Sequence, residues 1–197
     1  MASWIGVDVG GGRKGFDAAV IDDRKVLALR GRLSWQQVAD LVMACTPAAV
    51  AIDSPRTCAP KGHTAREGEL QIARQVCGIR WTPDARQIRA SPYYAWILEG
   101  FALFGALDDC ETEVIEVFPT ASWTRWHGRR GPRTRAAWSR QALAALGLEG
   151  VPARTNQDQR DAIAAALTAR QHTQGTTETI GGIVVPLAGR TPQTRAG

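Results

Sequence analysis

The chain has 197 residues and a formal net charge of +5, with 44% hydrophobic and 22% charged side chains, an ordinary composition for a globular protein. No apolar run approaches the roughly 20 residues that a membrane-spanning helix needs, and the N-terminus lacks a secretory signal pattern. We therefore expect a cytoplasmic protein with no membrane segment. The four cysteines form no C-x-x-C pair, so neither a zinc knuckle nor a disulfide framework is indicated.

The N-terminal part of the chain predicts three strands, a helix and a fourth strand. Apolar runs over 3–10, 15–22 and 25–33 are separated by short turns, which predicts an antiparallel meander. Ser34 then precedes a stretch with apolar residues at helical spacing, so a helix is expected up to Cys45. The continuous apolar run over 48–55 is typical of a central strand that is covered on both faces.

The rest of the chain alternates helices with shorter strands. Helical patterns cover 62–77, 92–107, 134–147 and 157–171, a strand covers 113–119, and 181–187 is a possible short last strand. We expect one domain over residues 1–190, with a helical insertion over 56–110, and a disordered tail over 191–197. This order predicts an α/β fold of the ribonuclease H-like type. Its mixed five-stranded sheet has three antiparallel strands, then two parallel ones, and is flanked by helices.

Acidic residues recur where such a sheet would place a binding site. Asp8 and Asp53 end the first and fourth strands, and Glu116 lies near the end of the strand at 113–119. Ligand sites in open α/β sheets lie beyond the carboxyl ends of the strands. Asp158 and Asp161 are three residues apart, so they share one face of a helix. We expect these acids to gather in one place.

A divalent metal ion would explain such a gathering. Buried carboxylates are costly without compensation and raise one another's pKa when close together. Carboxylate oxygens suit Mg²⁺ or Mn²⁺, and two such ions about 4 Å apart can drive phosphodiester hydrolysis. The alternative is that each acid separately caps a turn or a helix.

Basic residues indicate an anionic partner, and nucleic acid fits best. Residues 118–147 contain six arginines and no acid, interleaved with Trp123, Trp126 and Trp138; guanidinium pairs with phosphate, and indole offers a stacking face. The alternative is a solvated helix face whose tryptophans point into the core. The basic residues that could bind the substrate are Arg13, Lys14, Arg56 and Lys61, just past the strand ends, and Arg129, Arg130 and Arg133 in this stretch.

Four segments together resemble the DUF429 family of predicted nucleases: "GVDVGGGRKGFDAAVID", "VAIDSPRTCAPKGHTAREGELQIAR", "EVFPTASW" and "NQDQRDAIAAALTA". The resemblance covers most of the chain, from about Trp4 to Pro186, and implies the ribonuclease H-like fold and metal-dependent nuclease activity. In one departure, Thr120 stands where similar sequences have a second acid. The resemblance implies Asp8, Asp53, Glu116 and Asp161 as catalytic acids, and Asp8, Asp53, Asp158, Asp161 and Glu69 as metal ligands.

Two other functions remain open at this point. The glycine-rich turn over 10–15 resembles the phosphate-binding hairpin of actin-like and sugar-kinase ATPases, and its backbone amides could hold phosphate. Those enzymes enclose a nucleotide between two such domains, whereas 197 residues hold one. The other alternative is a non-catalytic module that keeps the fold and binds nucleic acid.

Overall fold

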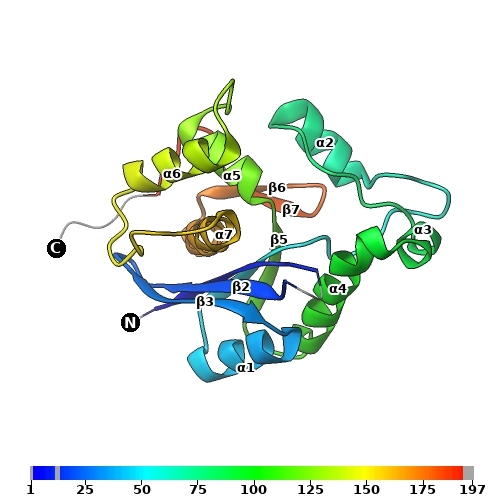
Figure 1. Ribbon diagram of the computed structural model, residues 1–197, viewed down its shortest axis with the longest axis horizontal. Helices are drawn as coiled ribbons and strands as arrows, with labels where there is room; N and C mark the ends of the chain where they lie inside the picture. Colours follow the sequence, from blue (N-terminus) through cyan, green and yellow to red (C-terminus); the bar gives the residue numbers. More distant parts are fainter. Residues whose placement is uncertain (1, 12–13, 193–197) are drawn as a thin grey trace.

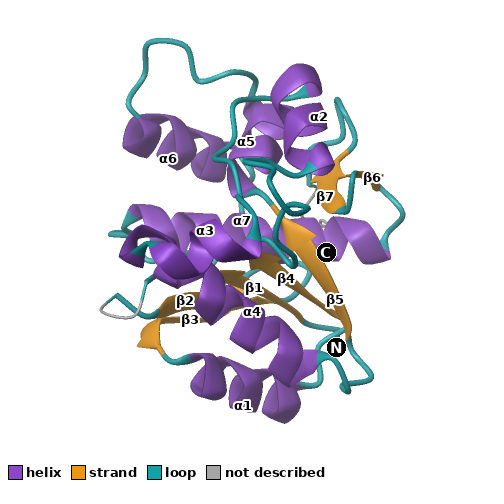
Figure 2. Ribbon diagram, turned by 90° about the vertical axis from the view of Figure 1, so that its right-hand side faces the viewer, coloured by secondary structure: helices purple, strands orange, loops and turns teal. Residues whose placement is uncertain are grey.

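The protein, described here from a computed structural model that covers residues 2–11 and 14–192, is built on one mixed sheet with helices on both faces (Figures 1 and 2). Its strand order is β3-β2-β1-β4-β5-β7-β6. The first three strands are antiparallel, whereas β4 and β5 run parallel to β1. This confirms the predicted mixed sheet. The bounds of these strands are Trp4–Asp8 (β1), Phe16–Ile21 (β2), Val26–Leu33 (β3), Ala49–Asp53 (β4) and Glu113–Val117 (β5).

The C-terminal part adds a hairpin to this sheet instead of the single short strand expected. Strands β6 (Thr177–Ile180) and β7 (Ile183–Pro186) pair antiparallel, and β7 pairs parallel with β5. Gly181 and Gly182 form the turn with φ values of 54° and 90°, which suit glycine. Three of the four residues of β6 are polar, so its sequence gave no strand signal. The tail expected over 191–197 lies outside the described residues from 193 onward.

Strand β3 forms the outer edge of the sheet and is irregular. Its pairing with β2 shifts register twice, and Arg32 adopts a left-handed φ of 61°. Arg30, Gly31 and Arg32 are partly or fully exposed there. The long edge strand is therefore twisted and basic rather than flat and apolar.

Helices cover both faces of the sheet (Figure 1). Helices α1 (Trp35–Cys45) and α4 (Ala95–Leu107) lie on one face, and α5 (Pro119–His127), α6 (Arg135–Ala145) and α7 (Gln157–Thr173) lie on the other. The insertion after β4 also contains α2 (Glu67–Gln75), α3 (Ala85–Ala90) and a 3₁₀ turn (Pro92–Tyr94). None of the helices in the described ranges is long and apolar enough to span a membrane.

Helix α7 packs unusually close to the centre of the sheet. Of its side chains, Ala162, Ala165, Ala166 and Ala169 are fully buried. A Cβ atom at Gly6 of β1 would lie only 2.0 Å from the backbone nitrogen of Ala166. Small residues on both sides therefore bring the α7 backbone directly against β1, which fixes the height of the helix above the strand ends.

The alternation of side chains decides which strand residues face α7. On β1, Trp4 belongs to the core on the α7 side, whereas Ile5 and Val7 belong to the core under α1 and α4. On β4, Ala49 and Ala51 face α7 in the same way. Because side chains alternate along a strand, Asp8 and Asp53 point toward α7.

Candidate metal centre and nucleic-acid surface

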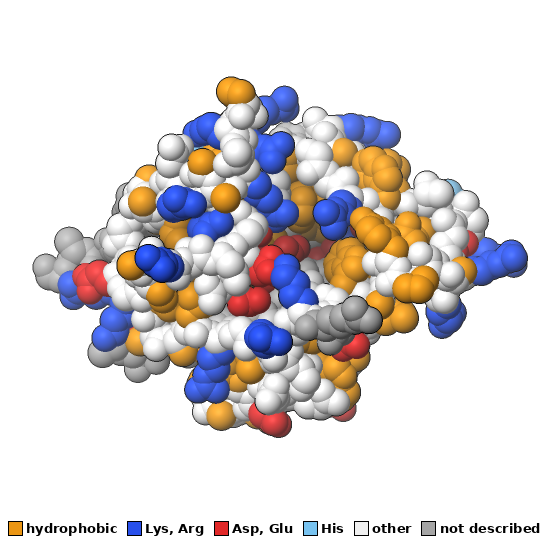
Figure 3. Space-filling view, viewed as in Figure 1, with side chains coloured by type: hydrophobic (Ala, Val, Ile, Leu, Met, Phe, Trp, Pro, Cys, Tyr) orange, Lys and Arg blue, Asp and Glu red, His pale blue; other side chains and the backbone are white. Residues whose placement is uncertain are grey.

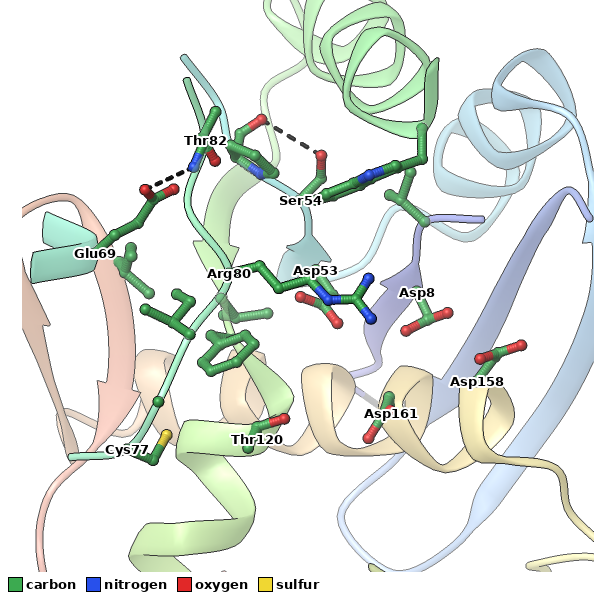
Figure 4. Close-up of a pocket in the computed structure, with 18 of the residues that line it drawn as sticks. Asp8, Asp53, Ser54, Glu69, Cys77, Arg80, Thr82, Thr120, Asp158 and Asp161 are labelled. Carbon is green, nitrogen blue, oxygen red and sulfur yellow. Dashed lines mark hydrogen bonds between the residues drawn. The ribbon is translucent and has the colours of Figure 1, made fainter. Parts of the chain in front are cut away.

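Asp8 and Asp53 end two neighbouring parallel strands at the same level. They are direct partners in the β1–β4 register, and the backbones of neighbouring strands are about 4.8 Å apart. Figure 4 shows both carboxylates beside the N-terminal part of α7, in a cavity that both residues line. The predicted neighbourhood of these two acids therefore follows from the strand order.

Helix α7 brings two further acids to this place. The side chain of Asn156 accepts a hydrogen bond of 2.7 Å from the backbone amide of Gln159, and this cap fixes where the helix begins. Asp158 lies in the first turn, and Asp161 follows one turn later with 1% of its surface exposed. Figure 4 shows both on the part of α7 that lies beside the strand-end acids. These four residues, Asp8, Asp53, Asp158 and Asp161, are named the acidic floor below.

Two residues of the acidic floor are paired with cations. Asp158 forms an ion pair with Lys14. One oxygen of Asp161 accepts a hydrogen bond of 2.8 Å from the indole nitrogen of Trp123, and the other accepts one of 2.8 Å from Arg135. The side-chain amide of Gln157 donates to both oxygens of Asp161 at 3.0 Å.

The strand-end acids are compensated less. Burial raises the pKa of Asp53 to about 8, with the charge of Asp161 adding to the effect and that of Arg135 opposing it. Burial also raises the pKa of Asp8 well above its usual range, and the charge of Asp53 is the next cause. Burial raises the pKa of Asp161 as well, against the charge of Arg135. The acidic floor therefore favours bound protons, or a bound cation in their place.

Glu116 and Glu69, also expected among the catalytic and metal-binding acids, line the same cavity but pair with Arg66 and are not part of the acidic floor. Glu116 is level with Ile52 and points to the opposite face of the sheet from Ile115, which belongs to the core on the α7 side. Its carboxylate forms an ion pair with Arg66, which also donates a bond of 2.9 Å to Glu69. Glu69 is 1% exposed and accepts a further bond of 2.8 Å from the backbone amide of Thr82. Both glutamates are thus held by one arginine.

The acidic floor lies in a cavity of 1480 Å³ whose walls differ in chemistry. Figure 3 shows acidic atoms at the bottom of a hollow, with basic side chains gathered above it and hydrophobic ones to its right. The basic wall is the segment that joins α5 to α6 and the start of α6, and it contributes Arg129, Arg130 and Arg135. The opposite wall belongs to the insertion and includes Tyr93 and Trp96.

Only some of the predicted substrate-binding residues line the cavity. Lys14, Arg129 and Arg130 line the cavity. Arg133 instead donates bonds of 2.8 Å to the carbonyls of Arg129 and Arg130, so it braces the basic wall.

Arg56 and Lys61 are not among the residues that line this cavity. The Arg56 guanidinium lies 4.9 Å above the Phe104 ring, donates to the carbonyl of Val114 at 3.1 Å and pairs with Asp108 at 3.4 Å. Lys61 is exposed in the loop before α2. Arg13, the remaining predicted residue, lies outside the described residues.

The tryptophans of the basic stretch belong to the core. Trp123 and Trp138 are 0% and 1% exposed, and Trp126 packs against the same core. Each indole nitrogen has a partner within the protein: Asp161 for Trp123, Gln171 for Trp126 and the carbonyl of Gly128 for Trp138. Of the two interpretations of this stretch, the one with the tryptophans in the core is therefore correct, because α5 and α6 turn these rings toward α7.

Several residues around the cavity gave no clear signal in the sequence. Arg135 was one arginine among six, and only the fold shows that it pairs with Asp161. Asp17 is the direct partner of Asp8 across the β1–β2 hairpin, and burial raises its pKa, with the charge of Asp158 as the next cause. Strict pairing of the predicted hairpin would have found Asp17. Tyr93 and Trp96 lie in the insertion, whose path the sequence did not predict.

The acidic floor suits a hard divalent cation in its donor atoms. Its four carboxylates are the ligands that Mg²⁺ and Mn²⁺ prefer. Burial first, and the charges of neighbouring acids second, raise the pKa values of Asp8 and Asp53, and a bound cation would offset both causes. As the side chains stand, no three or more His, Cys, Asp or Glu residues within 2–11 and 14–192 are gathered so that they could hold a metal ion. A cation bound by Asp8 and Asp53 would compete with Lys14 and Arg135 for the acids of α7.

The strand order, the acid-bearing strand ends and the helix across them define a protein of the ribonuclease H-like fold class. Two solved structures share this fold. Thermus thermophilus RuvC aligns with a TM-score of 0.51 and 16% identity, over 88% of this chain and 97% of that chain. T. thermophilus RuvC in complex with a Holliday junction substrate aligns with a TM-score of 0.50 and 16% identity, over 89% and 98%. At this identity the likeness shows the fold alone.

The family follows from the sequence itself. The family model described as "Protein of unknown function (DUF429)" matches residues 6–184. The chain therefore belongs to the DUF429 family, and the predicted resemblance is confirmed. A comparison with the sequences of curated proteins finds no match.

Proposed function

We propose that the protein is a metal-dependent nuclease that hydrolyses phosphodiester bonds of nucleic acid at the acidic floor. One observation carries this proposal: four carboxylates from two strand ends and one helix line the same cavity, which also has a basic wall. The basic wall suits a phosphate backbone, and the acids suit Mg²⁺ or Mn²⁺. The shared fold of RuvC, solved with a Holliday junction, is consistent with a nucleic-acid partner.

In this proposal the residues of the cavity have different roles. Asp8 and Asp53 would hold the cation, because they are adjacent and buried, and Asp158 and Asp161 would complete its ligands in place of their ion pairs with Lys14 and Arg135. A bound divalent ion would lower the pKa of the attacking water and stabilise the negative charge on the phosphate. Lys14 and Arg135, once released, are positioned to contact that phosphate. Glu69 and Glu116 stay with Arg66 and keep α2 attached to β5.

The ion pairs at the acidic floor also favour a second candidate, a non-catalytic module that binds nucleic acid. Lys14 and Arg135 already neutralise two of the four acids, as they would in a protein that never binds a metal. The two functions differ in one measurable respect: only the nuclease cleaves nucleic acid when Mn²⁺ is added.

The test is Mn²⁺-dependent cleavage of single-stranded and duplex nucleic acid by the wild type and by Asp8→Asn. Asparagine keeps the shape and one carbonyl oxygen but loses the charge that holds the cation, so we expect cleavage to fall by about a hundredfold or more. In chelator, Asp8→Asn should melt at a higher temperature than the wild type, because an acid with a raised pKa is replaced by a neutral group.

Asp22→Asn is the matched control. Asp22 accepts bonds of 2.8 Å from the backbone amides of Arg24 and Lys25, and its pKa is lowered, with these two bonds as the main stabilising cause. Its replacement should lower the melting temperature slightly and leave cleavage unchanged. Nucleic-acid binding without any Mn²⁺-dependent cleavage would favour the binding module, and hydrolysis of ATP without nucleic acid would favour an ATPase.

A further inference from the structure

The apolar wall of the cavity carries aromatic side chains that the proposed chemistry does not use. Tyr93, in the 3₁₀ turn before α4, is 61% exposed. Trp96 follows in the first turn of α4 and is partly exposed. Both line the cavity that contains the acidic floor.

Close packing holds this aromatic wall beside the acids. A Cβ atom at Gly100 of α4 would lie 1.9 Å from Oγ of Ser54, the residue that follows Asp53. Trp96 precedes Gly100 by four residues and therefore lies on the same face of the helix. Trp96 also lies close to the end of β1. A Cβ atom at Gly11, three residues after Asp8, would lie 3.8 Å from the Cβ of Trp96. The position of Trp96 is thus set against both strand ends.

The basic wall faces the same acids from the other side. Arg129 and Arg130 are exposed, and Arg133 holds their backbone through two hydrogen bonds of 2.8 Å. The hollow in Figure 3 accordingly has basic groups on one side and hydrophobic groups on another, with acids between them. Its volume of 1480 Å³ exceeds the roughly 300–1,000 Å³ of small-ligand pockets, so it suits a segment of a polymer.

We propose that this cavity binds single-stranded nucleic acid, with an unpaired base stacked on Trp96 and Tyr93 and the backbone phosphates along Arg129 and Arg130. The inference rests on the proposed function and specifies its substrate. Stacking on an aromatic side chain needs a free base face, which every unpaired base offers. In a duplex the bases are already stacked and paired, and their exposure costs free energy. The aromatic wall therefore selects single strands, whereas the basic wall binds any phosphate backbone.

Binding without cleavage tests this inference. Fluorescence anisotropy in chelator, at one salt concentration, compares labelled oligonucleotides of about 12 nucleotides as deoxy and ribo single strands and as duplexes of the same sequence. We expect the wild type to bind one or both single strands about tenfold tighter than the duplexes. The two single strands distinguish DNA from RNA as the occupant.

Variants of the aromatic wall show which side chains are responsible. Tyr93→Ala and Trp96→Ala should each weaken single-strand binding by about five- to tenfold and leave duplex binding unchanged. Tyr93→Phe and Trp96→Phe keep an aromatic face and should retain most of the affinity. Leu98→Ala is the matched control, because Leu98 is 42% exposed on the same helix and does not line the cavity. A 2-aminopurine base in the single strand should be quenched by the wild type and less by the alanine variants.

Equal affinity for single strands and duplexes would overturn the inference, as would an equal loss of both in Tyr93→Ala with an unchanged melting temperature. These results are separable from the test of the proposed function. If Mn²⁺-dependent cleavage is equal for single strands and duplexes and is unchanged in Tyr93→Ala, the aromatic site is refuted and the nuclease proposal stands. If single strands bind selectively but are not cleaved, the nuclease proposal is refuted and the aromatic site stands.

Discussion

Asp22 and Asp53 show how far the position of an aspartate decides its chemistry. Asp22 begins the turn between β2 and β3 and accepts two backbone hydrogen bonds, which favour its charged form and lower its pKa. Asp53 ends a central strand under α7, where burial and the charge of Asp161 raise its pKa to about 8. The same side chain thus stabilises a turn in one place, and in the other it favours binding of a proton or a cation.

The raised pKa of Asp53 predicts how the stability of the metal-free protein depends on pH. Asp53 has a pKa of about 8 in the folded state, against about 3.9 in an unfolded chain. Between about pH 4 and pH 8 the folded protein therefore keeps a proton that the unfolded chain has lost, so its free energy of unfolding falls as the pH rises. We expect the melting temperature in chelator to fall from about pH 5 to about pH 8.

Asp53→Asn and Mn²⁺ are the controls for this pH dependence. The variant lacks one of the acids with a raised pKa, so its melting temperature should change less over the same range. Mn²⁺ should stabilise the wild type more at about pH 8 than at about pH 5, because metal binding displaces the proton. If the wild type in chelator is instead most stable near pH 8, Asp53 is not the buried acid described here.

The site residues were predicted well where a strand end fixes them and poorly where a helix or loop does. Asp8 and Asp53 follow from two apolar runs and the order of the strands, so their register pairing needed no further information. Glu116 was placed by the same argument but lies one position out of phase, and a shift of one residue turns a side chain to the opposite face. Arg135 and Trp96 depend on how α6 and α4 approach the sheet, which periodicity does not show.

Among the elements, α7 determines the site most directly. Its alanines and Gly6 allow the backbones of the helix and β1 to touch, and this contact sets Asp158 and Asp161 above the strand ends. The predicted helix over 157–171 agrees with the observed Gln157–Thr173. Composition indicated a small-residue helix, but only the packing shows that these residues set the position of two acids.

Gly6→Ala tests this role of α7. The added Cβ would lie 2.0 Å from the nitrogen of Ala166 and 2.2 Å from the carbonyl oxygen of Ala162, so the helix must move away from β1. We expect a loss of stability of about 3 kcal/mol or more, and weaker Mn²⁺ binding, because the acids of α7 move with it. Differential scanning calorimetry with and without Mn²⁺ measures both effects.

Gly105→Ala in α4 is the control for this substitution, because nothing lies within 4 Å of its added Cβ. Alanine is the better helix former by about 1 kcal/mol, so this variant should be as stable as the wild type or slightly more stable. Equal melting temperatures for Gly6→Ala and the wild type would show that α7 can shift freely and does not fix the acidic floor.

The elements that were missed share a physical cause. Pro119 indicated the end of a strand but is in fact the first residue of α5, where a proline loses no hydrogen bond. Helix α3 has six residues, too few for a periodic pattern, and its start depends on the cap that Asp84 provides to the amide of Gln87. Short elements of this kind form through tertiary packing rather than through their own sequence.

At the scale of the whole molecule, the net charge of +5 matters less than its distribution. The basic wall places Arg129 and Arg130 at the rim of the cavity, whereas Arg140 of the same basic stretch lines a separate cavity beside α6. Arg125 is not free either, because it pairs with Glu178 at 2.7 Å. Only part of the basic stretch can therefore contact a ligand above the acidic floor.

This distribution predicts the salt dependence of nucleic-acid binding. Each phosphate contact contributes about 0.9 log unit of affinity per log unit of salt on duplex DNA. Arg129→Gln and Arg130→Gln should each reduce that slope by up to this amount. Arg140→Gln changes the net charge equally and should leave the slope unchanged. Identical slopes for all three variants would place the bound phosphates elsewhere on the surface.

The irregular edge strand β3 has a consequence for how the molecule behaves at high concentration. An exposed edge offers unpaired backbone groups to which a strand of another molecule can add, and flat apolar edges do this most readily. In β3 the two register shifts and the left-handed Arg32 disturb the hydrogen-bonding row. The charges of Arg30 and Arg32 also repel an identical edge. Strand β3 thereby protects its edge of the sheet from edge-to-edge aggregation.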